Sequence, residues 1–143
     1  MERTFVLDAP LDTVFDYVAD FENTNEWDPG TIETRRTGGD GGVGTTYANR
    51  STFLGREVEL AYETIVHERP HRVVLRGRNG RTTATDDLGF VAEGDGRTRM
   101  TYRITFDFPL LIGLVAPVVA RRPLRALARE VVENLQGVFA TPR

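Results

Sequence analysis

Phe21-Glu22-Asn23-Thr24-Asn25-Glu26-Trp27-Asp28-Pro29-Gly30 is the stretch that decides the fold of this chain. We expect a short helix over about Thr24–Asp28 that carries the tryptophan, because Pro29-Gly30 ends it. The residues before this stretch predict a strand at Thr4–Asp8 and an amphipathic helix at Pro10–Asp20. The chain therefore opens with a strand, a helix and a second, shorter helix.

Six further strands are predicted after the short helix, because turn residues interrupt the sequence at short intervals. The turn signals are Gly38–Gly44, Leu54-Gly55, His67–His71, Asn79-Gly80 and Gly94-Asp95-Gly96. Connections this short favour antiparallel pairing of neighbouring strands.

A long amphipathic helix is predicted at the end of the chain, roughly over Leu110–Phe139. Pro117 and Pro123 should kink this helix or divide it in two. Its apolar run Leu110–Ala120 is about eleven residues, whereas a helix needs roughly 20 to cross a bilayer. We therefore expect no membrane span.

The first predicted hairpin turn indicates which side chains face inward. A two-residue loop at Leu54-Gly55 places Arg50 opposite Glu59 and Tyr47 opposite Tyr62. Charged residues then fall on one face of the sheet and apolar residues on the other.

The Asn79-Gly80 turn predicts the next pairing. As a two-residue loop it places Arg72 opposite Asp87 on the outer face and Val73 opposite Asp86 on the inner face. A buried carboxylate is thus expected on the inner face.

The Gly94-Asp95-Gly96 turn predicts the third pairing. A three-residue loop places Asp87 opposite Arg103 on the outer face and puts Tyr102 on the inner face. Together with Arg72, these residues are expected to form an outward row of alternating charge.

The predicted inner face is more polar than a closed core. Its polar members are Tyr47, Asn49, Ser51, Tyr62, Thr64, Thr82, Asp86 and Tyr102. Burying each of these groups without a partner would cost roughly 1–3 kcal/mol. An apolar cavity with a few convergent polar groups is the usual composition of a small-molecule pocket.

Asp86 is the candidate catalytic residue, because burial of its carboxyl group should raise its pKa. It would hold a ligand, or act as a general acid or base in an enolisation or dehydration. The alternative is a structural carboxyl group near a wet cavity mouth, bonded to a tyrosine or an arginine. The residues leave both interpretations open.

The candidate ligand-pocket residues are Trp27, Tyr47, Asn49, Tyr62, Asp86 and Tyr102. Aromatic residues on a half-buried strand also serve simply as core. Tyr62 lies opposite Gly77 in the predicted register, so it has the further alternative of covering a strand glycine.

Composition sets the class of protein. The 143 residues fit a single domain, residues 1–143, and the net charge of −3 with no basic helix face gives no electrostatic signature of nucleic-acid binding. The sequence has no cysteine and opens without an apolar leader, so we expect a cytoplasmic protein.

Missing residue types exclude several chemistries. All 18 basic residues are arginines, which excludes Schiff-base lysines and a P-loop. Ser51 is the only serine and lacks a nucleophile-elbow motif, while His67 and His71 have no carboxylate at metal-ligand spacing on a shared helix face. We expect no cofactor and no metal site, so any catalysis would use carboxylates, tyrosines or histidines.

The chain resembles the SRPBCC superfamily of START and Bet v 1-like helix-grip proteins, in its bacterial polyketide cyclase/dehydrase-like branch. The similar pieces are Ala9-Pro10, Phe21-x-Asn23-x-x-x-Trp27-Asp28-Pro29, Val43-Gly44-Thr45-x-Tyr47, Phe53-x-Gly55 and Thr98-x-Met100-x-Tyr102. The resemblance implies an α+β fold: a curved antiparallel sheet of about seven strands, wrapped around a long C-terminal helix with an internal cavity. It also implies that Trp27 helps to close that cavity.

Three functions follow from this resemblance. The first is a carrier or sensor of a hydrophobic or amphipathic small molecule, lipid-like or polyketide-like. The second is a cyclase/dehydrase-like enzyme without metal or covalent nucleophile, in which Asp86 or a tyrosine moves a proton. The third is a co-chaperone-like interaction module. We expect a monomer or weak homodimer.

Overall fold

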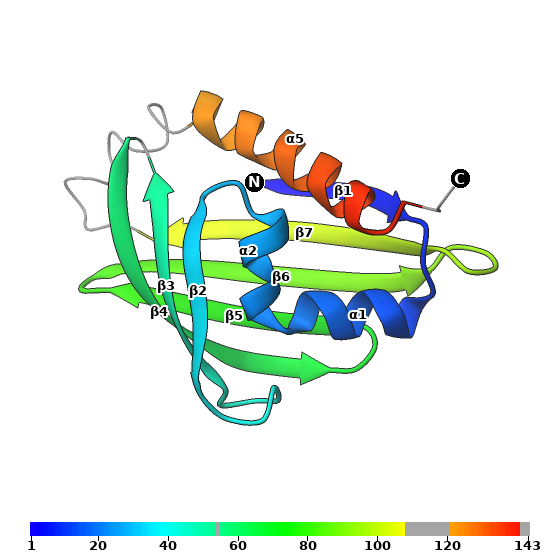
Figure 1. Cartoon of the computed structure of the whole chain (residues 1–143), viewed down its shortest axis with the longest axis horizontal. Coiled ribbons are helices and arrows are strands. Elements are labelled where there is room, and N and C mark those ends of the chain that lie inside the picture. Colours follow the sequence, from blue (N-terminus) through cyan, green and yellow to red (C-terminus); the bar gives the residue numbers. More distant parts are fainter. Residues whose placement is uncertain (54, 108–120, 141–143) are drawn as a thin grey trace.

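One antiparallel sheet dominates the fold. A computed structural model describes residues 1–53, 55–107 and 121–140. In this part of the chain seven strands pair in the order β1-β7-β6-β5-β4-β3-β2 (Figure 1). Their bounds are β1 Glu2–Leu7, β2 Thr31–Gly38, β3 Thr46–Phe53, β4 Arg56–Glu68, β5 Arg72–Asn79, β6 Thr82–Ala92 and β7 Thr98–Asp107.

The helices lie on one face of this sheet (Figure 1). The C-terminal helix α5 lies along β1 and β7, and α1 packs over β6. Their bounds are α1 Leu11–Ala19, η1 Phe21–Asn23, α2 Thr24–Trp27 and α5 Arg121–Val138. The predicted α+β helix-grip fold is confirmed. A one-turn 3-10 helix, η1, was not predicted.

The prediction that Pro117 and Pro123 kink or divide the last helix stays a prediction, because it depends on residues before Arg121 that lie outside the described part of the chain. Pro123 is the third residue of α5, which runs through it without a break. Proline is tolerated in a first helical turn because its missing N–H would have no intrahelical partner there. The predictions for Pro117 and Leu110–Ala120 lie outside the described residues.

The β3–β4 register is as predicted, with Arg50 opposite Glu59 and Tyr47 opposite Tyr62. Tyr62 also lies opposite Gly77 on β5. The inner and outer faces of these strands are therefore those expected from the sequence.

The predicted β5–β6 register is wrong by two residues. Asn79 pairs with Thr82, so the loop is Gly80-Arg81. Asn79 stays in the sheet because its side-chain amide donates to the Glu59 carbonyl on β4 at 2.8 Å. Asp86 consequently lies opposite Leu75 instead of Val73. A two-residue shift leaves Asp86 on the inner face.

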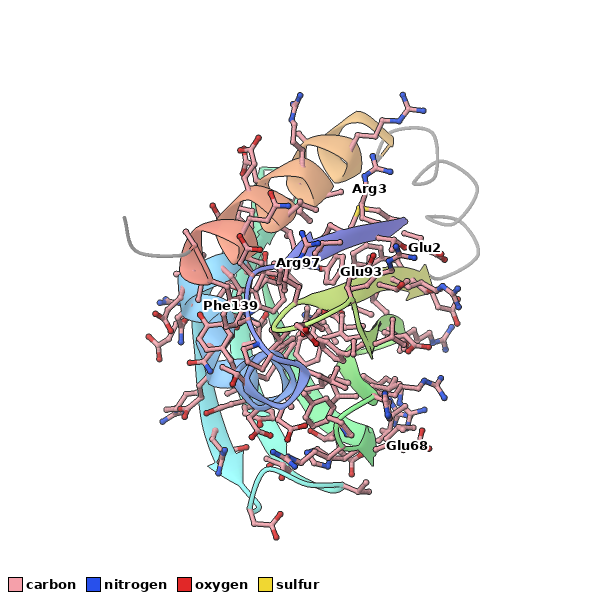
Figure 2. All side chains as sticks on the ribbon, turned by 90° about the vertical axis from the view of Figure 1, so that its right-hand side faces the viewer. Glu2, Arg3, Glu68, Glu93, Arg97 and Phe139 are labelled. Carbon is pink, nitrogen blue, oxygen red and sulfur yellow. The ribbon has the colours of Figure 1, made fainter. Side chains whose placement is uncertain are left out.

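The β6–β7 register is as predicted, with Asp87 opposite Arg103. On the outer face, Arg72 reaches Asp87 diagonally, with N and O atoms 3.0 Å apart. Arg103 instead pairs with Glu2 of β1 at 2.8 Å. Figure 2 shows Glu2 and Glu68 on the side of the sheet away from α5.

A single apolar cluster joins the sheet to the helices. The buried side chains of α1 are Val14, Phe15, Val18 and Ala19. Those of α5 are Ala128, Val131 and Leu135. Within residues 1–53, 55–107 and 121–140, no helix is both long and apolar enough to cross a membrane.

Candidate functional site

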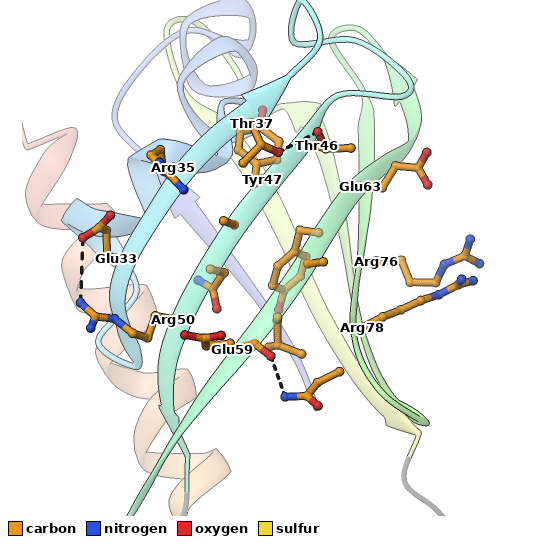
Figure 3. A pocket seen from close by; sticks show the side chains of 16 residues that line it. Glu33, Arg35, Thr37, Thr46, Tyr47, Arg50, Glu59, Glu63, Arg76 and Arg78 are labelled. Carbon is orange, nitrogen blue, oxygen red and sulfur yellow. Dashed lines mark hydrogen bonds and ion pairs between the residues drawn. The ribbon is translucent and has the colours of Figure 1, made fainter.

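A hollow bordered by described residues lies on the outer face of β2–β5 (Figure 3). Its volume is about 1040 Å³. Charged side chains surround it, including Arg76 and Arg78, and Arg50 lies 3.9 Å from Glu33. A smaller hollow of about 260 Å³ lies over β5–β7 on the same face, beside Arg72 and Asp87. The internal cavity expected from the sequence stays a prediction.

Polar side chains instead gather on the inner face, beneath the helices. Asp86 of β6 is 2% exposed and lies between Leu75 and Ile104 on the flanking strands. Its Oδ1 atom is buried and has no hydrogen-bond partner in the described part of the chain. An unpaired buried acceptor or donor is costly, so this atom is available for a hydrogen bond to a bound molecule.

Tyr102 of β7 lies beside Asp86 on the same face. It is 1% exposed and sits opposite Leu88, two residues along from the pair of Asp86 and Ile104. Its hydroxyl group is buried and, among the residues described, unpaired. Neighbouring strands thus present a carboxyl and a phenol group at a diagonal spacing that long side chains bridge.

Trp27 lies against Tyr102. The tryptophan is fully buried at the end of α2, and its ring meets that of Tyr102 edge-on, with centroids 6.1 Å apart and planes at 89°. Its backbone carbonyl accepts a hydrogen bond from the Asn134 side chain of α5 at 3.0 Å. Its indole Nε1 atom is buried and finds no acceptor within the described residues.

Tyr62 covers Gly77. A methyl group built on Gly77 would come within 2.7 Å of the Tyr62 ring, so this ring lies directly over the glycine. The absence of a side chain at Gly77 lets the tyrosine reach across β5 toward β6. The alternative that Tyr62 covers a strand glycine is confirmed.

Asp28 joins this group and was not predicted as a site residue. It directly follows Trp27, and its Oδ1 atom accepts the Gly30 N–H at 2.9 Å. Burial raises the pKa of Asp28, and the hydrogen bond from Gly30 opposes this shift. The signal in the sequence was its place in the Trp27-Asp28-Pro29 motif.

The carboxyl group of Asp86 and the hydroxyl groups of Tyr62 and Tyr102 favour their neutral forms. Burial, and then the charge of Asp28, raise the pKa of Asp86 well above its ordinary value. Burial and the charges of Asp86 and Asp28 likewise raise the pKa values of Tyr62 and Tyr102 well above theirs. We name Trp27, Asp28, Tyr62, Asp86 and Tyr102 the acid–tyrosine cluster.

Asn49 lies apart from the acid–tyrosine cluster, with both ends of its amide engaged. Its Nδ2 atom donates to Thr34 Oγ1 at 2.8 Å, and its Oδ1 atom accepts from Ser51 at 2.7 Å. Thr24 of α2 donates to the same Thr34 hydroxyl at 2.7 Å. The structure therefore gives Asn49 a role in joining β2 and β3 to α2.

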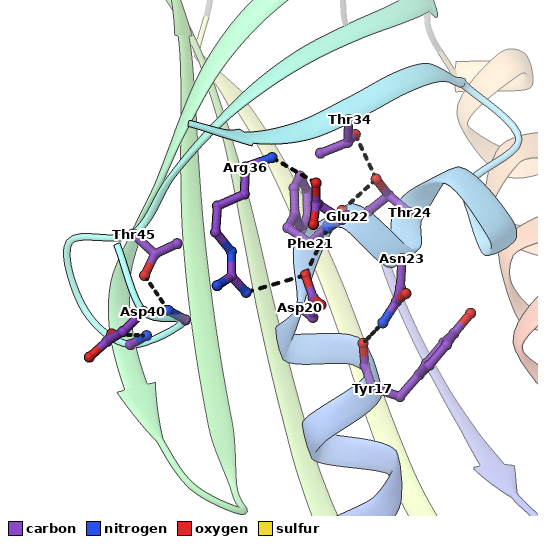
Figure 4. A network of polar contacts seen from close by, with 12 residues as sticks. Tyr17, Asp20, Phe21, Glu22, Asn23, Thr24, Thr34, Arg36, Asp40 and Thr45 are labelled. Atoms are coloured by element: carbon purple, nitrogen blue, oxygen red, sulfur yellow. Dashed lines mark hydrogen bonds and ion pairs between the residues drawn. The ribbon is translucent and has the colours of Figure 1, made fainter. Parts of the chain in front are cut away.

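Tyr47 belongs to a second polar group, near η1. It packs on the ring of Phe21 with centroids 5.8 Å apart, and it lies opposite Arg36 in the β2–β3 register. Arg36 approaches Asp20 at 3.7 Å, as Figure 4 shows. Burial raises the pKa of Tyr47. Arg36, like Asp28, was not predicted as a site residue.

The comparison with family models decides the family. A model described as polyketide cyclase/dehydrase and lipid transport matches residues 1–140. The chain belongs to this family. Its sheet and C-terminal helix are the helix-grip arrangement of START-like proteins. No curated protein matches the sequence.

Solved structures similar to this polyketide cyclase/dehydrase family member share its fold at low identity. The aromatase/cyclase Zhui from Streptomyces sp. R1128 is 17% identical, with a TM-score of 0.73 over 97% of this chain and 92% of that one. A START superfamily protein from Mycobacterium smegmatis is 13% identical, with a TM-score of 0.74 over 97% and 95%.

A third similar structure is longer. The di-domain ARO/CYC BexL from the BE-7585A biosynthetic pathway is 16% identical, with a TM-score of 0.69. The match covers 100% of this chain and 50% of BexL, so the family member spans half of that protein. At this identity the likeness is one of fold.

Proposed function

We propose that this chain binds a hydrophobic or amphipathic small molecule, lipid-like or polyketide-like, between the inner face of its sheet and α5, as a carrier or sensor. The observation that carries the proposal is the acid–tyrosine cluster. Three of its members present a fully enclosed polar atom that has no partner among the described residues, namely Trp27 Nε1, Asp86 Oδ1 and Tyr102 OH.

The surroundings of the cluster support an apolar ligand. The neighbouring inner-face side chains are buried and apolar, and they include Leu75, Leu88, Phe90, Met100 and Ile104. Apolar walls with a few convergent polar atoms are the composition of sites that take up hydrophobic small molecules. The family, whose description includes lipid transport, supports the same class of ligand.

Native mass spectrometry of the freshly purified protein tests the proposal, followed by denaturing extraction and identification of small molecules. A co-purifying lipid or polyaromatic mass is the expected result. An apo mass, together with no thermal shift across a lipid and polyketide panel, would contradict it and favour the interaction module or an enzyme with a transient substrate. The same spectrum gives the oligomeric state, which is predicted to be a monomer or a weak homodimer.

A cyclase/dehydrase-like enzyme is the second candidate, and one observation favours it. The raised pKa of Asp86 suits a carboxylic acid that donates a proton to an apolar substrate. Asp86→Asn separates the two candidates, because it should abolish turnover of an enzyme and change a carrier's affinity by only about threefold. Asp87→Asn, one residue away on the outer face, is the matched control.

A further inference from the structure

The acid–tyrosine cluster offers hydrogen-bond donors. An indole Nε1 atom only donates, and a tyrosine hydroxyl donates one hydrogen. Both atoms are enclosed and unpaired within the described residues, at Trp27 and Tyr102. Asp86 lies beside them. The protonation state of its carboxyl group decides whether the cluster offers a ligand only donors or also an acceptor.

The surroundings of Asp86 favour its protonated form. Its partners on the flanking strands are Leu75 and Ile104, and the ionisable groups of its cluster are the acids Asp28, Tyr62 and Tyr102. The chain contains no lysine. A carboxyl group buried without a cation takes up a proton. It then becomes a third donor beside the other two.

Register brings the donors to one place. Asp86 and Tyr102 lie on adjacent strands, diagonally by two residues and on the same face. The Trp27 ring stands edge-on to the Tyr102 ring at 6.1 Å. The same three side chains are 2%, 1% and 0% exposed. These atoms are enclosed, so a ligand that satisfies them must lie inside the fold.

We propose that the ligand of this site presents a carbonyl oxygen to the cluster, and that Trp27, Asp86 and Tyr102 donate hydrogen bonds to it. The inference rests on the proposed function and adds the chemical group that is recognised. A carbonyl oxygen accepts two or more hydrogen bonds and carries no hydrogen of its own. A hydrocarbon would leave the donors unpaired, and a protonated amine, which has no acceptor, would oppose donor to donor.

Three probes of nearly equal size test the inference: 9-fluorenone, which carries a ketone, fluorene, which carries a methylene group, and 9-aminofluorene, which carries an amine. Binding to the full chain is measured by quenching of Trp27 emission and by calorimetry. Fluorenone should bind at least about tenfold more tightly than either analogue, because only it satisfies the donors. Equal affinity for fluorene, or tighter binding of the amine, would overturn the inference.

Variants identify the donors. Asp86→Leu and Tyr102→Phe should each reduce the preference for fluorenone over fluorene by about fivefold or more. Asp86→Asn keeps an N–H donor and should retain the preference within about threefold. Asp87→Asn on the outer face and Tyr17→Phe, whose hydroxyl bonds Glu26, are the controls and should change nothing. A preference unchanged in Asp86→Leu and Tyr102→Phe would overturn the assignment.

An infrared measurement tests the same contact in the wild-type protein. A carbonyl oxygen that accepts hydrogen bonds absorbs at lower frequency, so the C=O band of bound fluorenone should fall below its position in an apolar solvent. An unshifted band overturns the inference. A co-purifying ligand without a carbonyl oxygen overturns it too but leaves the proposed function standing, whereas failure of all three probes and of native mass spectrometry overturns both.

Discussion

Residues 86 and 87 show how strongly the two faces of one strand differ. Asp86 is buried among apolar side chains, while Asp87 forms an exposed ion pair with Arg72 at 3.0 Å. Two identical side chains thus meet opposite environments one residue apart. The difference leads to a prediction about stability and pH.

Asp86→Asn should stabilise the protein at neutral pH and have little effect near pH 4. Because burial raises the pKa of Asp86, the folded protein holds this proton more tightly than the unfolded chain, and its stability falls as pH rises above about 4. Asparagine removes that cost, so the melting temperature at pH 7 should rise by roughly 3–10 °C. Circular dichroism melts from pH 4 to pH 8 measure it.

The control for this prediction is Asp87→Asn, which removes an exposed ion pair and should change stability by about 0–1 kcal/mol. A gain from Asp86→Asn that is equal at every pH would contradict the account, because the gain would then come from something other than proton uptake.

Gly77 leads to a second prediction about stability. Its missing side chain makes room for the Tyr62 ring, so Gly77→Ala should destabilise the fold by about 1–3 kcal/mol. Gly89→Ala is the matched control, because the nearest atom to its new methyl group would be 4.0 Å away. Urea unfolding compares them, and equal stability of the two variants would show that Tyr62 does not depend on the glycine.

Among the elements, α5 supports the candidate site through the core and through Trp27. Its buried Val131 and Leu135 belong to the common core, and its Asn134 bonds the Trp27 carbonyl at 3.0 Å. Packing of this helix therefore fixes the position of the tryptophan. The contribution of α5 to the stability of the fold can be tested by one substitution at a buried position and one at an exposed position.

Leu135→Ala should cost about 2–5 kcal/mol, because it leaves a cavity beneath α5. Glu133→Ala, on the exposed face of the same helix, should cost less than about 0.5 kcal/mol. Urea unfolding monitored by circular dichroism gives both values. Similar losses in the two variants would mean that α5 contributes through its helix propensity and not through packing.

Prediction from the sequence succeeded where local pattern decides the element. The inner and outer faces follow from strand alternation, and they placed Asp86 and Tyr102 correctly. The loop at residues 80 and 81 was missed because Asn79 is held in the sheet by Glu59, a contact 20 residues away. Asp28 was missed for a similar reason, since its partial burial depends on helices brought over the sheet by tertiary packing.

At the scale of the whole molecule, the core is one cluster that joins β1, α1, η1, the sheet and α5. Nothing in the described core divides it into independent parts. Small proteins with one core unfold in a single cooperative transition. The side chains of Trp27, Tyr62 and Tyr102 lie inside this core, so the candidate site should form and disappear with the fold.

Fluorescence and circular dichroism should therefore report the same unfolding curve. Trp27 is the only tryptophan and is fully buried, so its emission reports the interior alone, while far-ultraviolet circular dichroism reports the sheet and helices. Coincident midpoints in urea are expected. An earlier transition in fluorescence would contradict this account, because it would mean that α5 and α2 separate from a sheet that is still folded.

The alternation of Asp86 and Asp87 has a consequence for the register of β6. A shift of two residues in its pairing keeps every side chain on its own face, whereas a shift of one exchanges the buried acid for the exposed one. The same one-residue shift would carry the buried Leu88 and Phe90 to the outer face, at the cost of their burial. The apolar residues of β6 therefore decide which of the two neighbouring acids faces inward.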